Sequence, residues 1–394
     1  MDALASFRQL LLQDAAVQRA LGALERHDAF VPRACAEAAA RGLTLSPDAV
    51  SAALHPDPLG LSAPPVIFTH DWPPAGWRPI GVLRGADGRI VVDWAFFGDV
   101  PLAEPFFEMS ARAVRRLPFN RLCRWRTTLE DFLAAAPDDA PAPRGLVFHM
   151  SRCGSTLVAQ MLAAAQHHIV LSEAPPVDAM VRLREFLPTA CDDDRRRALV
   201  AMTAALGRRV AGAGDLFVKL DSWHSIALPL FRAAFPQTPW VFLYRDPVEV
   251  LVSQMRARGM QTVPGLLPAE LQGEGDAEPL GPEDFCAQVL AKGCAAAIEH
   301  YSGGGGLFVD YADLPEAFFT KILPHFGLSP SSADSAAMRA AAQRDAKAPQ
   351  FTFSPDADEK RAAATAAIRA AARSRLGTLY GELDTLRRKA NGGD

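Results

Sequence analysis

The chain has 394 residues, 49% of them hydrophobic and 22% charged, which is enough apolar sequence for two or three domains with proper cores. The net charge of −4 excludes a nucleic-acid-binding protein whose whole surface is basic, and no stretch approaches the roughly 20 apolar residues that span a bilayer. The six cysteines form no CxxC pair or Cys/His zinc spacing, and the N-terminus lacks the pattern of a signal peptide. We therefore expect a cytoplasmic protein with reduced thiols and with no nucleic-acid or membrane partner.

The first part of the chain is expected to be a small helical domain over residues 1–54. Apolar residues at helical spacing predict a first helix over 4–24. Asp28 is placed to cap a second helix, and Pro47 begins a third. The Pro- and Gly-rich segment 55–64 predicts a linker.

A β-hairpin with two helices is expected over residues 65–140. Residues 78–98 contain two apolar segments around Ala-Asp-Gly, which is typical of a hairpin with a tight turn. Helices are predicted around 104–116 and 127–136, followed by a second linker over 136–144. This unit is expected to cover the following domain or to shape an acceptor pocket.

From residue 145 onward, short apolar strands alternate with helices, and the C-terminal tail from about 357 is helical. This order predicts a P-loop-like, three-layer α/β domain with a mainly parallel sheet over 145–394. The predicted strands are residues 145–149, 168–172, 216–220, 240–244 and 307–311. Residues 262–282 predict a surface loop, and the run of four glycines at 303–306 predicts a turn.

The first predicted strand of this domain runs directly into a candidate anion-binding loop. Gly154 permits close backbone approach, Ser155 and Thr156 offer hydroxyl groups, and Arg152 adds a permanent cation beside a helix start. The simpler alternative is a Ser/Thr cap on an ordinary helix. No Lys follows Gly154 as a Walker A loop requires, which disfavours metal-dependent ATP chemistry.

A second strand–turn–helix junction offers another candidate anion site. Arg245 closes the strand, Asp246 is placed to cap the helix, and Pro247 occupies its first position. Ser253 interrupts the apolar face of that helix. The alternatives are a surface salt bridge for Arg245 and a bond from Ser253 to its own helix.

These two segments resemble the nucleotide motifs of the PAPS-dependent sulfotransferase family, where PAPS is 3′-phosphoadenosine 5′-phosphosulfate. The segment that resembles the 5′-phosphosulfate motif is Arg152, Cys153, Gly154, Ser155 and Thr156. The family's 3′-phosphate motif is an Arg that closes a strand and a Ser eight residues later, as at Arg245 and Ser253. The resemblance covers about residues 145–355.

The chain is most similar to the protein-tyrosine sulfotransferase branch. In that branch a Glu base follows the loop Arg by 21 residues, which falls on Glu173. A Lys precedes the 3′-phosphate Arg by 26 residues, which falls on Lys219, and a nucleotide-binding Tyr falls on Tyr311. Arg152, Glu173, Lys219, Arg245 and Tyr311 all lie at or near the ends of predicted strands, where open α/β sheets place their sites.

The resemblance implies transfer of a sulfuryl group from PAPS, with adenosine 3′,5′-bisphosphate as product and no metal required. Glu173 would act as base, and Lys219 with Arg152 would stabilise the transition state. The loop would hold the 5′-phosphate, and Arg245 with Ser253 the 3′-phosphate. If Glu173 is not the base, His149 is the first substitute and His224 the second.

The acceptor is expected to be a small molecule or a peptide with a hydroxyl or amine. Its identity is left open, because Cys153, Ser155 and His149 differ from the residues that are usual in the family motif. The oligomeric state is open as well. Lys347, Lys360 and Arg361 belong to a late segment that either contacts the nucleotide or forms a solvated loop. Alternative functions are a P-loop nucleotide kinase or other phosphotransferase, and a non-catalytic nucleotide-binding protein on the same scaffold.

The N-terminal helical segment is weakly similar to the Nif11-like leader domains of peptide natural-product precursors, on the spacing of Phe7 and Asp14 and on the segment 36–50. That similarity implies peptide-related chemistry or a docking module. A plain helical interaction domain is the alternative.

Overall fold

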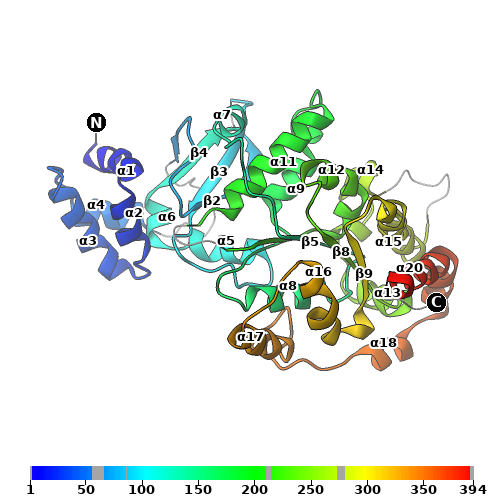
Figure 1. Ribbon diagram of the computed structural model, residues 1–394. Helices are drawn as coiled ribbons and strands as arrows, with labels where there is room; N and C mark the ends of the chain where they lie inside the picture. Colours follow the sequence, from blue (N-terminus) through cyan, green and yellow to red (C-terminus); the bar gives the residue numbers. More distant parts are fainter. Residues whose placement is uncertain (1, 56–65, 86, 210–213, 273–279, 391–394) are drawn as a thin grey trace. The chain divides into compact units, whose positions relative to one another are not determined.

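The computed structural model describes residues 2–55, 66–85, 87–209, 214–272 and 280–390 (Figure 1). The chain divides into two compact units. The first unit contains residues 1–141 and 174–213, and the second contains 142–173 and 214–394. None of the helices within the described ranges is long and apolar enough to cross a membrane.

The first unit begins with four helices. They are α1 (Ala3–Gln13), α2 (Ala15–Gly22), α3 (His27–Ala39) and α4 (Pro47–Ala53). The single helix expected over 4–24 is wrong, because Asp14 leaves the helical conformation and its carboxylate accepts from the N–H groups of Ala16 and Val17 to cap α2. Asp28 is not the cap of α3 but lies in its first turn, where it pairs with Arg26. Apart from His55, the linker predicted over 55–64 lies outside the described residues.

A four-stranded sheet forms the centre of the first unit. Its strands lie in the order β1–β4–β3–β2 and span Val66–Phe68 (β1), Trp77–Arg84 (β2), Ile90–Phe96 (β3) and Arg124–Thr128 (β4). The predicted hairpin is confirmed as antiparallel β2 and β3. The helix expected from 127 begins only at Leu129, because Thr128 ends β4 and caps the helix by accepting from Asp131 N–H.

Helices from two separate stretches of the chain complete the first unit. They are α5 (Phe107–Arg115), α6 (Pro118–Leu122), α7 (Leu129–Ala134), α9 (Pro175–Val181), α10 (Leu183–Phe186) and α11 (Asp192–Gly207). Stacked rings fill the core, with the centroids of Trp77 and Trp125 4.8 Å apart and those of Trp72 and Phe132 5.2 Å apart. Most of the aromatic residues of this unit are therefore core residues.

The second unit is built on a five-stranded parallel sheet, which confirms the predicted fold class. Its strands are β5 (Gly145–His149), β6 (Ile169–Ser172), β7 (Leu216–Lys219), β8 (Trp240–Tyr244) and β9 (Gly306–Asp310). Their order is β6–β7–β5–β8–β9, and every neighbouring pair is parallel. All five predicted strands are present, with ends within one residue of those expected.

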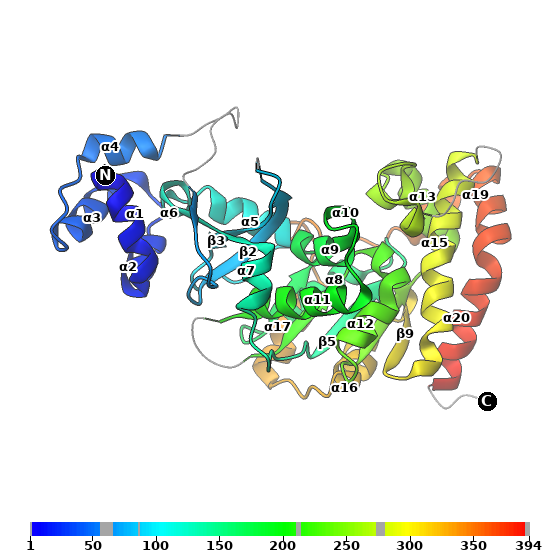
Figure 2. The same ribbon diagram turned by 90° about the horizontal axis from the view of Figure 1, so that it is seen from above.

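Helices cover both faces of this sheet. They are α8 (Ser155–Ala163), α12 (Leu228–Ala234), α13 (Pro247–Arg256), α14 (Ala269–Gln272), α15 (Pro282–Glu299), α16 (Leu323–His325), α17 (Ser332–Ala342), α18 (Ala357–Ala363), α19 (Ala366–Ala371) and α20 (Gly377–Ala390). In Figure 1, α8 and α17 lie on one face of the sheet and α12 on the other. Figure 2 shows α15 and α20 running side by side, so the predicted helical tail packs against the sheet's own helices. Residues 273–279 of the predicted loop lie outside the described residues.

The strand order places the end of β5 at the point where the sheet topology reverses. β5 is the first strand of this sheet in sequence, but it lies in its centre, between β7 and β8. The next two strands, β6 and β7, lie on one side of β5, and β8 and β9 lie on the other. Crevices for ligands form outside the carboxyl ends of strands at such points. The loop that follows β5 therefore begins at the favoured ligand position of the fold.

We predict that Gly306→Ala lowers the free energy of unfolding by about 1–3 kcal/mol. A Cβ on Gly306 would lie 2.5 Å from Cζ2 of Trp240, the first residue of β8, so the substitution forces this fully buried indole ring to shift. Urea denaturation measures the change. Gly303→Ala is the matched control, because a Cβ there meets nothing within 4 Å and should change stability by less than about 0.5 kcal/mol. Equal effects of the two substitutions would contradict this account.

Candidate functional site

The loop between β5 and α8 has a strained backbone. Ser151 has a φ of +77°, Arg152 of +53° and Gly154 of +82°. Within the described part of the chain, the non-glycine residues with positive φ are Ser151, Arg152 and Glu173, and each such residue costs on the order of 1–3 kcal/mol. Positive φ at residues preceding a helix turns backbone N–H groups toward one side, as in an anion-binding nest. The predicted anion loop therefore has the backbone that this role requires.

Two buried side chains hold Ser151 in its conformation. Its N–H donates to Nδ1 of His149 at 3.0 Å, and its hydroxyl accepts from Nε2 of Gln254 at 2.9 Å. Nε2 of His149 in turn donates to the carbonyl oxygen of Leu220 at 2.8 Å. Because both ring nitrogens of His149 are engaged by the backbone, this residue supports the loop and is not poised as a base.

Gly154 and Tyr311 fit together at the start of α8. Gly154 is the N-cap residue of that helix, and a Cβ there would lie 2.7 Å from Cδ2 of Tyr311. Tyr311 directly follows β9, so the ring of the predicted nucleotide-binding tyrosine forms one wall of the loop. Both its φ and this contact require glycine at position 154.

Cys153 contributes no side chain to the loop. Its thiol is fully buried and donates to the carbonyl oxygen of Leu243 at 3.1 Å, and burial raises its pKa to about 12. What Cys153 can offer an anion is its backbone N–H. Ser155 and Thr156 are buried in the first turn of α8, as predicted, and Arg152 donates from Nη2 to the carbonyl oxygen of Ala257 just after α13.

Glu173 and Lys219 form an ion pair at the ends of two adjacent strands. Ser172 pairs with Lys219 in the β6–β7 ladder, and Glu173 N–H continues it by donating to Lys219 O at 2.8 Å. The ammonium of Lys219 donates to Oε1 of Glu173, which also lies 3.6 Å from Nε2 of His149. The side chain of Lys219 has no exposed surface, whereas that of Glu173 is 25% exposed. The carboxylate is thus the member of the pair that solvent can reach.

The charge of this pair is set by its surroundings. Burial alone would raise the pKa of the Glu173 carboxyl, but the positive charge of Lys219 and the hydrogen bond from its ammonium hold this pKa well below its usual range. Burial lowers the pKa of His149, so this imidazole is neutral at physiological pH. Glu173 is therefore an ionised carboxylate at neutral pH.

Arg245 lies at the end of β8 in a second cluster of charges. Its Nε donates to Oε2 of Glu249 at 2.6 Å, and its Nη2 donates to Oδ1 of Asp356 at 3.0 Å. Its guanidinium lies 4.0 Å from the centre of the Tyr311 ring. Arg245 and Glu249 are both buried, and a buried charge needs a partner of opposite charge. The predicted 3′-phosphate arginine has two such partners, the carboxylates of Glu249 and Asp356.

The late segment reaches the same cluster through α18. Asp356 precedes this helix and also accepts from Lys360, whose ammonium lies 2.7 Å away and which is buried. Arg361, on the exposed side, lies 2.7 Å from Oε1 of Glu249. Three cations and two carboxylates therefore meet here, and the carboxylate of Asp358 lies 3.8 Å from Arg361 on the exposed side.

Lys347, in the loop before α18, faces the first cluster. The charges of Arg152, Lys219 and Glu173 all act on its ammonium. Lys347 is exposed, but partial desolvation of its ammonium and repulsion by the two cations together lower its pKa to about 8. The backbone turn at Lys347 is fixed by Asp345, whose carboxylate accepts from the backbone N–H of Lys347 at 2.9 Å.

The structure thus brings most of the predicted residues together at one edge of the sheet, in two clusters joined by Tyr311. Ser253 lies half-buried on α13, and no hydrogen bond connects it to Arg245 among the described residues. Sequence reasoning missed Glu249, Gln254 and Asp356. Only Glu249 carried a signal, because it follows Arg245 by four residues, in the first turn of the predicted helix.

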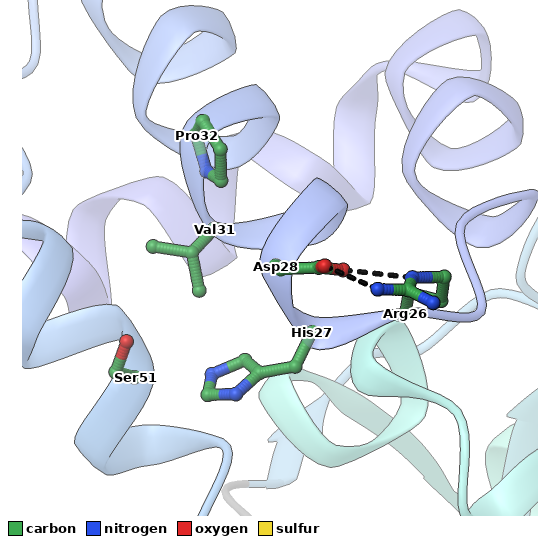
Figure 3. A pocket seen from close by; sticks show the side chains of 6 residues that line it. All are labelled: Arg26, His27, Asp28, Val31, Pro32 and Ser51. Carbon is green, nitrogen blue, oxygen red and sulfur yellow. Dashed lines mark hydrogen bonds and ion pairs between the residues drawn. The ribbon is translucent and has the colours of Figure 1, made fainter.

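A separate pocket lies on the N-terminal helices and contains none of the predicted site residues (Figure 3). Its lining comes from α3 and α4 and consists of Arg26, His27, Asp28, Val31, Pro32 and Ser51. Figure 3 shows Asp28 turned toward Arg26, with which it forms an exposed ion pair. Such exposed pairs contribute little to binding or stability.

No sequence-family model and no curated protein sequence matches this chain. Solved structures that are similar to it include sulfotransferase STF9 from Mycobacterium avium, with 14% identity, 54% of this chain and 71% of that chain covered, and a TM-score of 0.36. The sulfotransferase domain of the Synechococcus PCC 7002 olefin synthase has 14% identity and a TM-score of 0.37, and the match covers 64% of this chain and 97% of that chain. The sulfotransferase domain from the curacin biosynthetic pathway has 16% identity and a TM-score of 0.37, and the match covers 65% of this chain and 99% of that chain. Identities and TM-scores at this level assign the chain to no family.

Proposed function

We propose that this protein is a sulfotransferase that moves a sulfuryl group from PAPS to a hydroxyl or amine of a small-molecule or peptide acceptor. The observation that carries the proposal is the ion pair of the buried Lys219 with the partly exposed Glu173, beside a loop of positive-φ residues. A fixed cation, a carboxylate that solvent can reach and a backbone nest are the groups that in-line transfer of a sulfuryl group needs.

The residues present fit a donor with anions at two positions. The loop from Ser151 to Thr156, with Lys219, forms one cationic centre, and Arg245 forms the other. Tyr311 lies between the two centres, against Gly154 on one side and Arg245 on the other. A nucleotide that carries a 5′-phosphosulfate and a 3′-phosphate would place one anion at each centre.

PAPS supplies an activated sulfuryl group when it is bound. Lys219 then turns its ammonium from Glu173 toward the negative charge that develops on the transferring group. Glu173 loses its ion-pair partner, so its pKa rises toward neutrality and its carboxylate becomes a better base for the acceptor hydroxyl. Arg152 and the backbone N–H groups of the loop stabilise the leaving phosphate. No residue in this scheme requires a metal ion.

Two measurements test this function. By calorimetry without metal, the protein should bind adenosine 3′,5′-bisphosphate more tightly than ATP, because only the former presents a phosphate to Arg245. With ³⁵S-labelled PAPS and a panel of simple phenols and alcohols, Glu173→Gln should lower turnover by about 10²–10⁴-fold and change nucleotide affinity little. Glu299→Gln, an exposed position in the same unit, is the matched control.

Tighter binding of ATP than of adenosine 3′,5′-bisphosphate would contradict the proposal and favour a nucleotide kinase. Full turnover by Glu173→Gln would show that Glu173 is not the base. Tight binding of adenosine 3′,5′-bisphosphate with no transfer to any acceptor in the panel would favour the non-catalytic binding protein.

We predict that Asp356→Asn raises the affinity for adenosine 3′,5′-bisphosphate by about 3–10-fold, which corresponds to roughly 0.7–1.4 kcal/mol. The carboxylate of Asp356 occupies Nη2 of Arg245 and neutralises Lys360, so it competes with an incoming phosphate for both cations. Calorimetric titration measures the change. Glu299→Gln also removes one carboxylate charge, at an exposed position on α15 outside this cluster, and should leave the affinity unaltered. A weaker affinity in Asp356→Asn would instead make Asp356 a support for the site.

We predict that anion affinity falls as the pH rises through about 8 and that Lys347→Met removes this dependence. The ammonium of Lys347 is charged below its pKa of about 8 and neutral above it, so its attraction for an anion is lost on the alkaline side. Binding of adenosine 3′,5′-bisphosphate should be measured from pH 6.5 to 9.5. Lys292→Met, on α15, is the control and should keep the wild-type profile. An unchanged profile in Lys347→Met would show that the lysine does not face the bound anion.

A further inference from the structure

A group of metal-ligating side chains lies at the opposite edge of the second unit's sheet. His167, His168 and Asp215 each offer one ligand atom, and these atoms all lie within 4.8 Å of one another. None of them belongs to the proposed donor site, which uses the carboxyl ends of the strands. These three residues precede the amino ends of β6 and β7.

The β6–β7 ladder fixes the spacing between these residues. Ile169 pairs with Leu216 in parallel register, and the N–H of Ile169 donates to the carbonyl oxygen of Asp215 at 2.9 Å. His168 and Asp215 are therefore neighbours across two hydrogen-bonded strands. The cluster is a consequence of strand pairing and does not depend on an isolated surface loop.

His168 is already oriented as a ligand. Its Nδ1 lies 2.8 Å from the carbonyl oxygen of Leu162, which can only accept, so Nδ1 carries the proton and Nε2 keeps its lone pair. Metal-bound histidines typically use their second nitrogen in this way, because the bond fixes the tautomer and the ring orientation. The ring also packs between His167, at 4.4 Å, and Phe217, at 4.9 Å between centroids.

The donor set is that of a zinc-type ion. Two imidazoles and one carboxylate suit a divalent transition metal with nitrogen and oxygen ligands at roughly 2.0–2.2 Å, with water in the fourth position. Ligand atoms on such an ion are about 3.3 Å apart in a tetrahedron, from those bond lengths. His167 is exposed and Asp215 half-buried, so rotation of these two side chains can close the remaining distance onto His168.

A further carboxylate stands near the cluster. Asp334, in the first turn of α17, interacts electrostatically with both imidazoles, and its Oδ2 accepts from the hydroxyl of Ser331 at 2.7 Å. It adds negative charge that favours a cation at this position.

We propose that His167, His168 and Asp215 form a binding site for a zinc-type divalent metal ion that ties together the amino ends of β6 and β7. The same two strands end at Ser172 and Lys219, next to the Glu173–Lys219 pair. A four-residue strand separates the two edges by roughly 10–13 Å, so the ion stabilises the sheet and takes no part in the transfer reaction.

The test uses the full chain without an affinity tag, freed of metal by a chelator. Calorimetric titration with ZnCl₂ should reveal one site, and thermal unfolding should shift to higher temperature as Zn²⁺ is added, since an ion that binds only the folded state stabilises it. His168→Ala should weaken binding by at least about tenfold and abolish the thermal shift. Asp215→Asn, which preserves the side-chain shape, should weaken binding as well and serves if His168→Ala does not fold.

His27→Ala is the matched control, because it removes an exposed histidine beside an aspartate in the first unit. It should bind Zn²⁺ as the unaltered chain does. Co²⁺ in place of Zn²⁺ should give visible absorption of a nitrogen- and oxygen-ligated ion without a thiolate charge-transfer band. Three results would overturn the proposal: no stoichiometric Zn²⁺ binding, undiminished affinity in both His168→Ala and Asp215→Asn, or a thiolate band from the cysteines.

Discussion

The buried ammonium of Lys219 is the constraint on which the rest of the site depends. A lysine side chain with no exposed surface must have an anion beside it, because desolvation of an isolated charge costs several kcal/mol. The chain supplies that anion with Glu173, which leaves β6 with a φ of +50° to reach it. The strained end of β6 and the low pKa of Glu173 both follow from compensating this one charge.

In the free protein, Lys219 and Arg245, the cations at the carboxyl ends of β7 and β8, are both paired with carboxylates. Glu173 pairs with Lys219, while Glu249 and Asp356 pair with Arg245. Under the proposed function, binding of an anionic ligand would be an exchange of partners, and its affinity would be the difference between two sets of ion pairs. This arrangement keeps buried cations stable without ligand, and it makes the neighbouring carboxylates as important for ligand affinity as the cations themselves.

The sequence alone predicted the five strands of the parallel sheet and the residues at their ends, because short apolar segments alternate with helices and each chemical group directly follows a strand. It failed where a contact depends on chain segments far apart. Asp356 lies 111 residues from Arg245 in the sequence, and no pattern in the residues around Asp356 indicates that its carboxylate pairs with this arginine. The inward turn of the Cys153 thiol and the strand before Leu129 were missed because tertiary packing decided them.

The contact between Gly154 and Tyr311 has a consequence for the order in which the protein can be made. The loop forms directly after the first strand of the sheet, but its wall comes from a tyrosine 157 residues later, after the last strand. On the ribosome, the chain would emerge with its anion loop open on one side until β9 pairs with β8. The loop could then be closed only after residue 311 has been synthesised, so that a truncated chain lacking β9 has the loop's sequence but not its wall.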